Sequence, residues 1–190
     1  GHKLNYSLDL DGGRFFLTVG GTTVGRTWAN AARTQQLEEY TVTTLKCTVH
    51  SFNDFAIWYT PGVAAPCKAI QAEPELVYEY TNKWNTVIVV SDGTRVLGLG
   101  DIGPKAGLPV MEGKALLYKY LGGVDGFPIM LDTKDPDAII NTVLMLQPGV
   151  GGVNLEDIAQ PKCFYILDTL REKADIPVWT STRVGAMPSR

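Results

Sequence analysis

Three short apolar runs rich in Val, Ile and Leu lie in the middle of the chain, and they constrain the fold more than any other feature. A segment with helical periodicity, from about Gly113 to Leu121, precedes the last of them. Short apolar runs separated by a helix are typical of buried parallel strands joined by a crossover. We therefore expect an α/β fold with a mainly parallel sheet. The runs are VIVV (87–90), VLGL (96–99) and FPIML (127–131).

Further elements on both sides of this centre complete the expected domain. X-Pro and Pro-Gly turns, acidic helix starts and apolar periodicity mark their ends. Together they predict a single three-layer domain over residues 51–179. The predicted helices are Ala64–Ala72, Glu75–Thr81, Ala138–Leu146 and Pro161–Lys173, and the predicted strands are Gly151–Leu155 and Ile176–Trp179.

Residues 1–50 have a different pattern, which predicts a small β-rich segment or arm before this domain. Asp11-Gly12-Gly13 is a turn sequence between two strand-like runs, Tyr6–Leu10 and Arg14–Val19, so we expect a hairpin. A short helix over Ala29–Glu39 and a strand over Thr41–His50 follow in the prediction. Residues 180–190 are small, polar and Gly/Pro-containing, which is typical of a tail.

Composition excludes several classes of function. The net charge of -3 and pI near 5.4 argue against nucleic-acid binding, which needs a basic face. Apolar runs stay shorter than the roughly 18 residues of a membrane span. The three cysteines form no CxxC pair, so they support neither a disulfide framework nor a zinc site, and a reducing cytoplasm fits best.

A glycine pattern invites a nucleotide-binding interpretation that we do not favour. Residues 98–103, GLGDIG, match the G-x-G-x-x-G pattern. A dinucleotide fingerprint needs its helix to begin at the glycines, so that free N–H groups meet the pyrophosphate. Pro104, Gly107 and Pro109 follow instead, and they predict a loop that continues to about Met111. A small acid bound by this loop, or a plain turn, is the preferred interpretation.

Charged side chains at the ends of the predicted strands are candidates for a ligand site. Arg95, Asp101 and Lys114 occupy such positions, where open α/β sheets bind their ligands. Glu156 and Asp157 are adjacent carboxylates after a strand, and hard divalent cations prefer oxygen ligands, although surface acid pairs are also common.

From residue 53 to about residue 179 the chain resembles the N-terminal, substrate-binding domain of malic enzymes, particularly the small prokaryotic type, whereas residues 1–50 do not match. The resemblance implies the fold predicted above and binding of a small organic acid. The matching segments are YTPGVAAPC (59–67), TNKWNTVIVVSDGTRVLGLGDIGPKAGLPVMEGKALLYK (81–119), GGVDGFPIMLDT (122–133) and GGVNLEDIAQPKCFYILDTLREKADIPV (151–178).

The same resemblance implies roles for five residues, and Asp101 remains a substrate-binding candidate by its position alone. Tyr59, in the YTP turn, corresponds to the general acid, and Lys114, in the EGK segment, to the general base. Arg95 corresponds to an arginine that binds a substrate carboxylate. Glu156 and Asp157 correspond to ligands of Mg²⁺ or Mn²⁺. Dimers of the small type place the tyrosine segment near a partner's lysine, which together with the β-rich start predicts a homodimer.

Two departures from the family pattern shape the functional prediction. After IPVW the chain continues with TSTR (180–183), so Thr182 stands where the family has its third metal ligand. We therefore expect weak metal binding or none. Arg183 would supply positive charge in place of the metal. The nicotinamide-binding part of the family is absent from these residues. We expect a free-standing lyase or isomerase without nicotinamide. It would decarboxylate, or catalyse enol/keto proton transfer on, a small 2-oxo or 2-hydroxy (di)carboxylic acid or a larger analogue. The alternatives are a truncated malic enzyme domain and a non-catalytic binding or dimerisation module.

Overall fold

The computed structural model describes residues 49–181 in full and, before them, the backbone of five short strands. The chain divides into two units, Gly1–Tyr40 and Thr41–Arg190, and each is described by itself. The strands form two antiparallel groups, β1-β2-β3 and β4-β5. They are β1 (Asn5–Asp9), β2 (Arg14–Val19), β3 (Thr22–Val24), β4 (Trp28–Asn30) and β5 (Gln35–Leu37).

The sequence predictions for the first unit have mixed outcomes. The antiparallel pairing expected of the hairpin is confirmed, because β1 and β2 pair from Asn5↔Thr18 to Asp9↔Arg14. The helix over Ala29–Glu39 is wrong, since β4 and β5 pair antiparallel there. A helix of that length is marginal without a face to bury, whereas a hairpin satisfies its own backbone groups. The strand predicted over Thr41–His50 lies, up to residue 48, outside the described residues.

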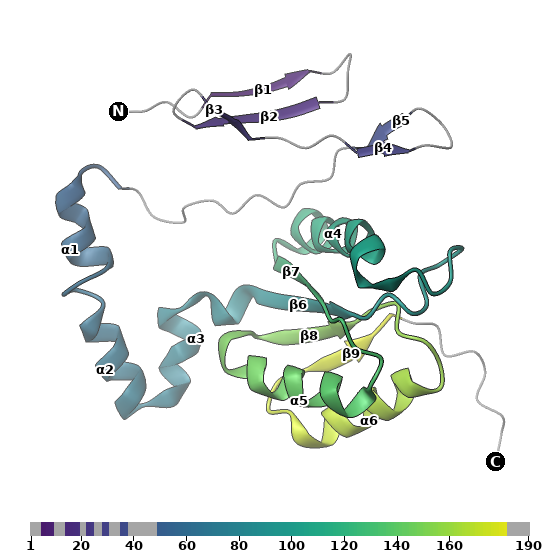
Figure 1. Ribbon diagram of the computed structural model, residues 1–190. Helices are drawn as coiled ribbons and strands as arrows, with labels where there is room; N and C mark the ends of the chain where they lie inside the picture. Colours follow the sequence, from purple (N-terminus) through teal and green to yellow (C-terminus); the bar gives the residue numbers. More distant parts are fainter. Residues whose placement is uncertain are drawn as a thin grey trace. The chain divides into compact units, whose positions relative to one another are not determined.

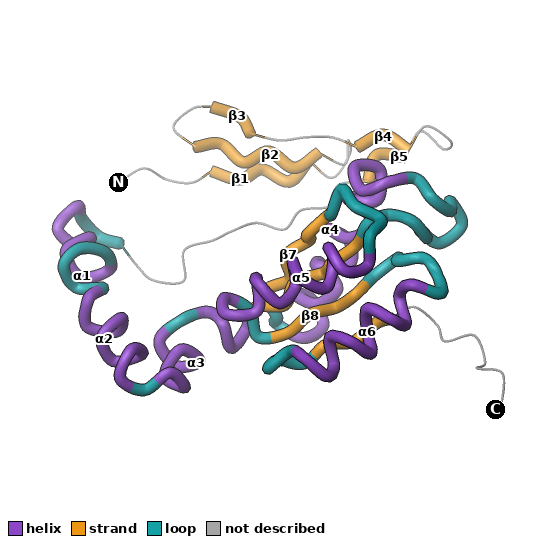
Figure 2. The backbone as a smooth tube through the Cα atoms, turned by 60° about the horizontal axis from the view of Figure 1, so that its bottom comes forward, coloured by secondary structure: helices purple, strands orange, loops and turns teal. Residues whose placement is uncertain are grey.

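A four-stranded parallel sheet in the order β7-β6-β8-β9 forms the centre of the second unit (Figure 1). Its strands are β6 (Thr86–Ser91), β7 (Asp125–Met130), β8 (Gly152–Leu155) and β9 (Val178–Thr180). Helix α4 (Gly103–Gly122) covers one face, and α5 (Pro136–Leu146) and α6 (Lys162–Lys173) lie side by side on the other (Figures 1 and 2). The predicted three-layer α/β architecture is therefore confirmed.

Alternation along the strands divides the core between the two faces of the sheet. Ile88, Val90, Val153 and Leu155 belong to a buried cluster with α5 and α6. The alternate residues of the strands face α4. On this face, a Cβ atom added to Gly126 of β7 would lie 2.9 Å from the Cα atom of Ala115 in α4. A helix packed this closely on β7 needs glycine at that position.

Helix α4 begins earlier than predicted. The expected loop to Met111 is wrong, because the helix starts at Gly103 and runs through Pro109. Pro104 occupies the first turn, where the missing N–H has no intrahelical acceptor. Gly107 is buried, and a Cβ there would lie 3.3 Å from the Cε atom of Met130. Packing against β7 thus outweighs the helix-breaking residues.

The strand predicted at residues 96–99 is also wrong. Val96 and Gly100 form only an isolated antiparallel bridge around a tight turn. Gly98 and Gly100 both have positive φ values, 78° and 79°, which glycine adopts without strain. Because no strand enters the glycine pattern, the strand–turn–helix context of a dinucleotide site is missing here. The nucleotide interpretation therefore fails for a different reason from the one that the sequence suggested.

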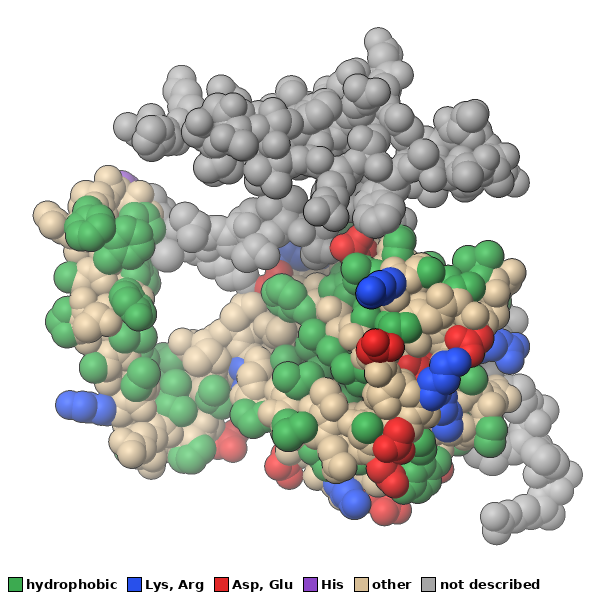
Figure 3. All heavy atoms as spheres, in the orientation of Figure 1, with side chains coloured by type: hydrophobic (Ala, Val, Ile, Leu, Met, Phe, Trp, Pro, Cys, Tyr) green, Lys and Arg blue, Asp and Glu red, His purple; other side chains and the backbone are tan. Residues whose placement is uncertain are grey.

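A helical arm precedes the sheet and packs little against it. It comprises η1 (Phe52–Asp54), α1 (Phe55–Trp58), α2 (Ala64–Ala72), η2 (Pro74–Leu76) and α3 (Val77–Tyr80), and these elements bury no residue. Helix α2 has the predicted bounds. Hydrophobic side chains gather on the arm (Figure 3), and Phe52 and Tyr59 are 86% and 69% exposed.

Two short 3-10 helices complete the second unit, η3 (Asn82–Asn85) before β6 and η4 (Gln147–Gly149) before β8. Within the described residues, every helix is too short or too polar to cross a lipid bilayer.

Candidate active site

The order of the strands determines where a ligand site can form. The chain passes from β6 to β7 on one side and then to β8 on the other side of β6. In doubly wound sheets of this order, ligands bind outside the carboxyl ends of the strands at the point where the order reverses. Here that point lies between β6 and β8. The loop after β6 carries Arg95, and the residues after β8 are Glu156 and Asp157.

A cavity of about 780 Å³ opens at this point. It brings together four of the six predicted site residues, Arg95, Lys114, Glu156 and Asp157. The α4 residues on its wall follow the helical spacing i, i+3, i+4, i+7, so one face of the helix lines it. The lining residues are Arg95, Leu97, Val110, Gly113, Lys114, Leu117, Glu156, Asp157, Gln160 and Ser181.

Lys114 and Glu156 form the ionic centre of the cavity. The Nζ atom of Lys114 lies 3.2 Å from Oε2 of Glu156, and their side chains are 26% and 15% exposed. Lys114 also donates to the hydroxyl of Ser181 at 3.0 Å, and that hydroxyl donates to Glu156. A cation from α4 and an acceptor from the end of β8 therefore meet in the cavity.

A chain of hydrogen bonds holds Glu156 in this orientation. Strand alternation places Asn154 and Glu156 on the α4 face of β8. Trp179 donates to the Tyr118 hydroxyl at 3.0 Å, and Tyr118 donates to Oδ1 of Asn154 at 3.0 Å. Asn154, which is fully buried, donates to Oε2 of Glu156 at 2.7 Å. Sequence reasoning missed this chain, although an asparagine inside an apolar strand was a usable signal.

Asp157 combines an unusual backbone with a perturbed carboxyl group. Its φ is 50°, and its carbonyl accepts the Arg95 N–H at 2.9 Å. Burial and, next, the negative charge of Glu156 raise the pKa of the Asp157 carboxyl, while Lys114 opposes the shift. The two carboxylates are adjacent in sequence and both line the cavity, so they offer oxygen ligands at one place. Glu156 and Asp157 therefore fit two ligands of a divalent cation.

Ser181 is a second site residue that sequence reasoning missed, because it lies in the segment predicted to be a tail. It follows β9 directly, at the same edge of the sheet as Glu156. No group of three or more metal-ligating side chains occurs in residues 49–181. Thr182, at the place of the family's third metal ligand, and Arg183, expected to supply charge, lie outside the described residues.

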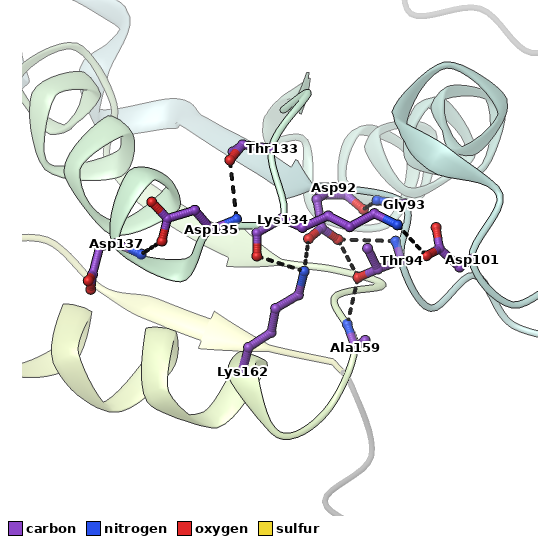
Figure 4. A network of polar contacts seen from close by, with 11 residues as sticks. Asp92, Gly93, Thr94, Asp101, Thr133, Lys134, Asp135, Asp137, Ala159 and Lys162 are labelled. Carbon is purple, nitrogen blue, oxygen red and sulfur yellow. Dashed lines mark hydrogen bonds and ion pairs between the residues drawn. The ribbon is translucent and has the colours of Figure 1, made fainter.

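Two predicted site residues do not line the cavity of this chain. Tyr59 ends α1 in the exposed arm, and its N–H donates to the carbonyl of Phe55. Asp101 is bound by Lys134, with 2.6 Å between Nζ and Oδ2 (Figure 4). That contact raises the pKa of Lys134.

The fold and the cavity together define an α/β domain that carries a polar ligand pocket at the switch point of a parallel sheet. The chain belongs to the malic enzyme family and corresponds to its N-terminal domain. The family model "Malic enzyme, N-terminal domain" matches residues 35–171. The resemblance stated from the sequence is therefore confirmed.

Relatives of known name agree with this assignment. A bifunctional malic/malolactic enzyme of Bacillus subtilis (strain 168) is 54% identical over 140 residues, which are 74% of this chain and 34% of the relative. An NAD-dependent malic enzyme of Geobacillus stearothermophilus is 54% identical over 143 residues, 75% of this chain and 30% of the relative. The crystal structure of malic enzyme from Pyrococcus horikoshii Ot3 superposes with a TM-score of 0.73 at 57% identity, covering 74% of this chain and 33% of that one.

These relatives correct one functional prediction. The expected lyase or isomerase independent of nicotinamide is wrong as an enzyme class, because the relatives are malic enzymes and one is named NAD-dependent. The chain spans about a third of the length of the relatives that it matches.

Proposed function

We propose that this chain is the substrate- and metal-binding part of a malic enzyme, which oxidises malate with NAD or NADP and decarboxylates it to pyruvate. The nicotinamide would be held outside these residues. The observation that carries the proposal is the convergence of Arg95, Lys114, Glu156 and Asp157 on one cavity. We assign the substrate-binding domain to residues 51–179. All residues that line the cavity lie in this range except Ser181, which follows it closely.

The cavity suggests a task for each of these side chains. Arg95 binds one carboxylate of the acid through its guanidinium group. Lys114 would take the proton of the 2-hydroxyl group as general base, and the nicotinamide would supply the hydride acceptor for the same oxidation. Glu156 and Asp157 would hold Mg²⁺ or Mn²⁺, which would supply positive charge next to the substrate while loss of CO₂ leaves an enolate. The enol carbon then needs a proton, and Tyr59 is the candidate donor.

Tyr59 can perform this task if a second copy of the chain contributes it. Among the described residues, no residue of the arm elements that carry Tyr59 is fully buried, and Phe52, Ile57 and Trp58 are 86%, 66% and 53% exposed. Apolar surface of this extent is typical of an interface. We propose a homodimer in which the arm of one copy brings Tyr59 to the cavity of the other.

Substitution of Lys114 tests the catalytic role. Lys114→Ala removes a partly exposed ion pair and should change the free energy of unfolding by about 1 kcal/mol or less. The rate of malate-dependent pyruvate formation by the whole protein, with Mn²⁺ and NAD or NADP, should fall roughly 10²- to 10⁴-fold. Lys114→Arg should lower the rate of pyruvate formation to a similar extent, because a guanidinium group does not accept a proton at working pH.

Lys119 provides the matched control, five residues further along α4 and not among the residues that line the cavity. It is 52% exposed and pairs with Asp125 at 2.8 Å. Lys119→Ala should leave turnover within about twofold of the unmodified protein, since an exposed pair contributes little. Unchanged turnover in Lys114→Ala would refute the assignment of Lys114 as the base.

A further inference from the structure

The two loops that carry the candidate site are tied together by a pair of hydrogen bonds. One loop follows β6 and contains Thr94 and Arg95, and the other follows β8 and contains Asp157 and Ala159. The Arg95 N–H donates to the Asp157 carbonyl at 2.9 Å. The Ala159 N–H donates to the Thr94 hydroxyl at 2.9 Å. Each tie lies next to a residue that lines the cavity, so together they determine the spacing of the loops.

A buried carboxylate fixes the direction of the Thr94 hydroxyl (Figure 4). Its single proton is donated to Oδ1 of Asp92 at 2.6 Å, which leaves a lone pair for Ala159. Asp92 also accepts the Thr94 N–H at 3.1 Å, and its side chain is fully buried.

Lys162, at the start of α6, neutralises Asp92 through an ion pair with Oδ2. A buried carboxylate without such a partner would carry an uncompensated charge, which costs free energy. The ion pair therefore keeps the Thr94 hydroxyl in one orientation.

The members of this clamp, Asp92, Thr94, Ala159 and Lys162, do not touch the cavity themselves. Residues within two positions of them, Arg95, Asp157 and Gln160, line it. Binding one acid between a guanidinium group and a carboxylate-held cation requires a constant distance between the two loops. The clamp residues therefore position the residues that line the cavity and do not bind the ligand themselves.

We infer that Thr94, oriented by the Asp92–Lys162 pair, is a positioning residue that sets the spacing between Arg95 and Asp157 and thereby the affinity for a dicarboxylic substrate. This inference deepens the proposed function and rests on it for the identity of the substrate. The clamp itself can be tested without that identity.

The experiment compares three single variants. Thr94→Val removes the hydroxyl and keeps the branched shape. Asp92 then retains the Thr94 N–H and Lys162 as donors, so the protein should fold. Thr94→Ser restores the hydroxyl. Thr142→Val is the control, because it deletes a hydroxyl that donates to the Ala138 carbonyl at 2.8 Å within α5, away from the cavity.

Two readouts are measured on the full chain or the whole protein. NMR amide exchange at Arg95 and Ala159 should be roughly tenfold faster in Thr94→Val and near normal in Thr94→Ser, because one net hydrogen bond is worth about a factor of ten. The KM for malate should rise roughly 10- to 100-fold in Thr94→Val, with a smaller change in kcat, and recover in Thr94→Ser. Thr142→Val should change neither readout.

The outcomes separate the clamp from the proposed function. Unchanged exchange at Ala159 in Thr94→Val overturns the clamp. Faster exchange with an unchanged KM overturns its positioning role, and an equal rise of KM in Thr142→Val does the same. An unmodified whole protein that neither binds nor converts malate would refute the proposed function, while the exchange data would still decide whether Thr94 ties the loops.

Discussion

Replacement of Lys83 tests how the sheet is held together at the edge opposite the candidate site. The Nζ atom of Lys83 donates to the carbonyls of Gln147, Pro148 and Val150 at 2.6, 3.2 and 3.0 Å. These bonds tie η3, before β6, to the turn before β8. Only 8% of the residue is exposed, and Nζ also lies 5.3 Å from the centre of the Tyr78 ring. Lys83→Met keeps the aliphatic stem and removes the ammonium group.

The contacts set the size of the expected effect. A hydrogen bond to a charged group contributes about 1.5–3 kcal/mol, so three bonds set an upper limit of roughly 4.5–9 kcal/mol. The true value is smaller for two reasons. Burial lowers the pKa of Lys83, which means that the charged form is itself penalised. Only the bond to Val150 is fully buried, so water can reach the other two carbonyls in the variant. We expect a loss of about 2–4 kcal/mol.

Urea unfolding followed by tryptophan fluorescence measures this loss. The midpoint should fall while the m-value stays constant, because the surface exposed on unfolding does not change. Tm should fall by about 5–15 °C for a chain of this size. Lys105→Met, at an exposed lysine of α4, is the control and should stay within about 0.5 kcal/mol. A free energy of unfolding for Lys83→Met within about 0.5 kcal/mol of the unmodified value would refute the reasoning.

Three further predictions follow from the site and its surroundings. Mixing Tyr59→Phe chains with Lys114→Ala chains should restore about a quarter of full activity, because half of randomly formed dimers are mixed and each has one intact site; no recovery would exclude a shared site. Glu112→Gln should raise the free energy of unfolding at pH 7 and leave it unchanged near pH 3. Burial raises the pKa of Glu112 above the usual value of 4.5, so the folded state keeps this proton to a higher pH than the unfolded state. The stability of the unmodified protein therefore falls as pH rises from 4.5 through the folded pKa. Mn²⁺ should bind Glu156 and Asp157 weakly alone and more tightly with oxalate, which adds two oxygen ligands, and tight stoichiometric Mn²⁺ binding without oxalate in a titration followed by electron paramagnetic resonance would contradict this.

Local sequence signals identified the elements whose ends are marked by strong residues. Helix α2 was predicted with its bounds because Pro and Gly flank it, and β6 because its β-branched run is buried on both faces. The same reasoning failed at α4, where Pro104, Gly107 and Pro109 look like loop residues. Their helix-breaking tendency amounts to a few kcal/mol and is outweighed when the helix buries Gly107, Met111 and Ala115.

The candidate site divides in a similar way. Arg95, Lys114, Glu156 and Asp157 could be chosen from the sequence, because they follow apolar runs and match a family motif. Their supporting contacts could not be chosen. Ser181 bonds Lys114 across 67 residues of chain, and Tyr118 bonds Asn154 across 36. No local pattern records such a pair.

The sequence by itself determined the family, the layers and the residue types that can carry the chemistry, because periodicity, turn residues and motifs act over a few positions. Tertiary structure decided the strand order β7-β6-β8-β9, and with it the meeting of the loops after β6 and β8. It also decided that the arm with Tyr59 stays exposed in a single chain. The physical reason is that burial of both faces of the sheet selects the strand order, and side chains distant in sequence become neighbours only once that order exists.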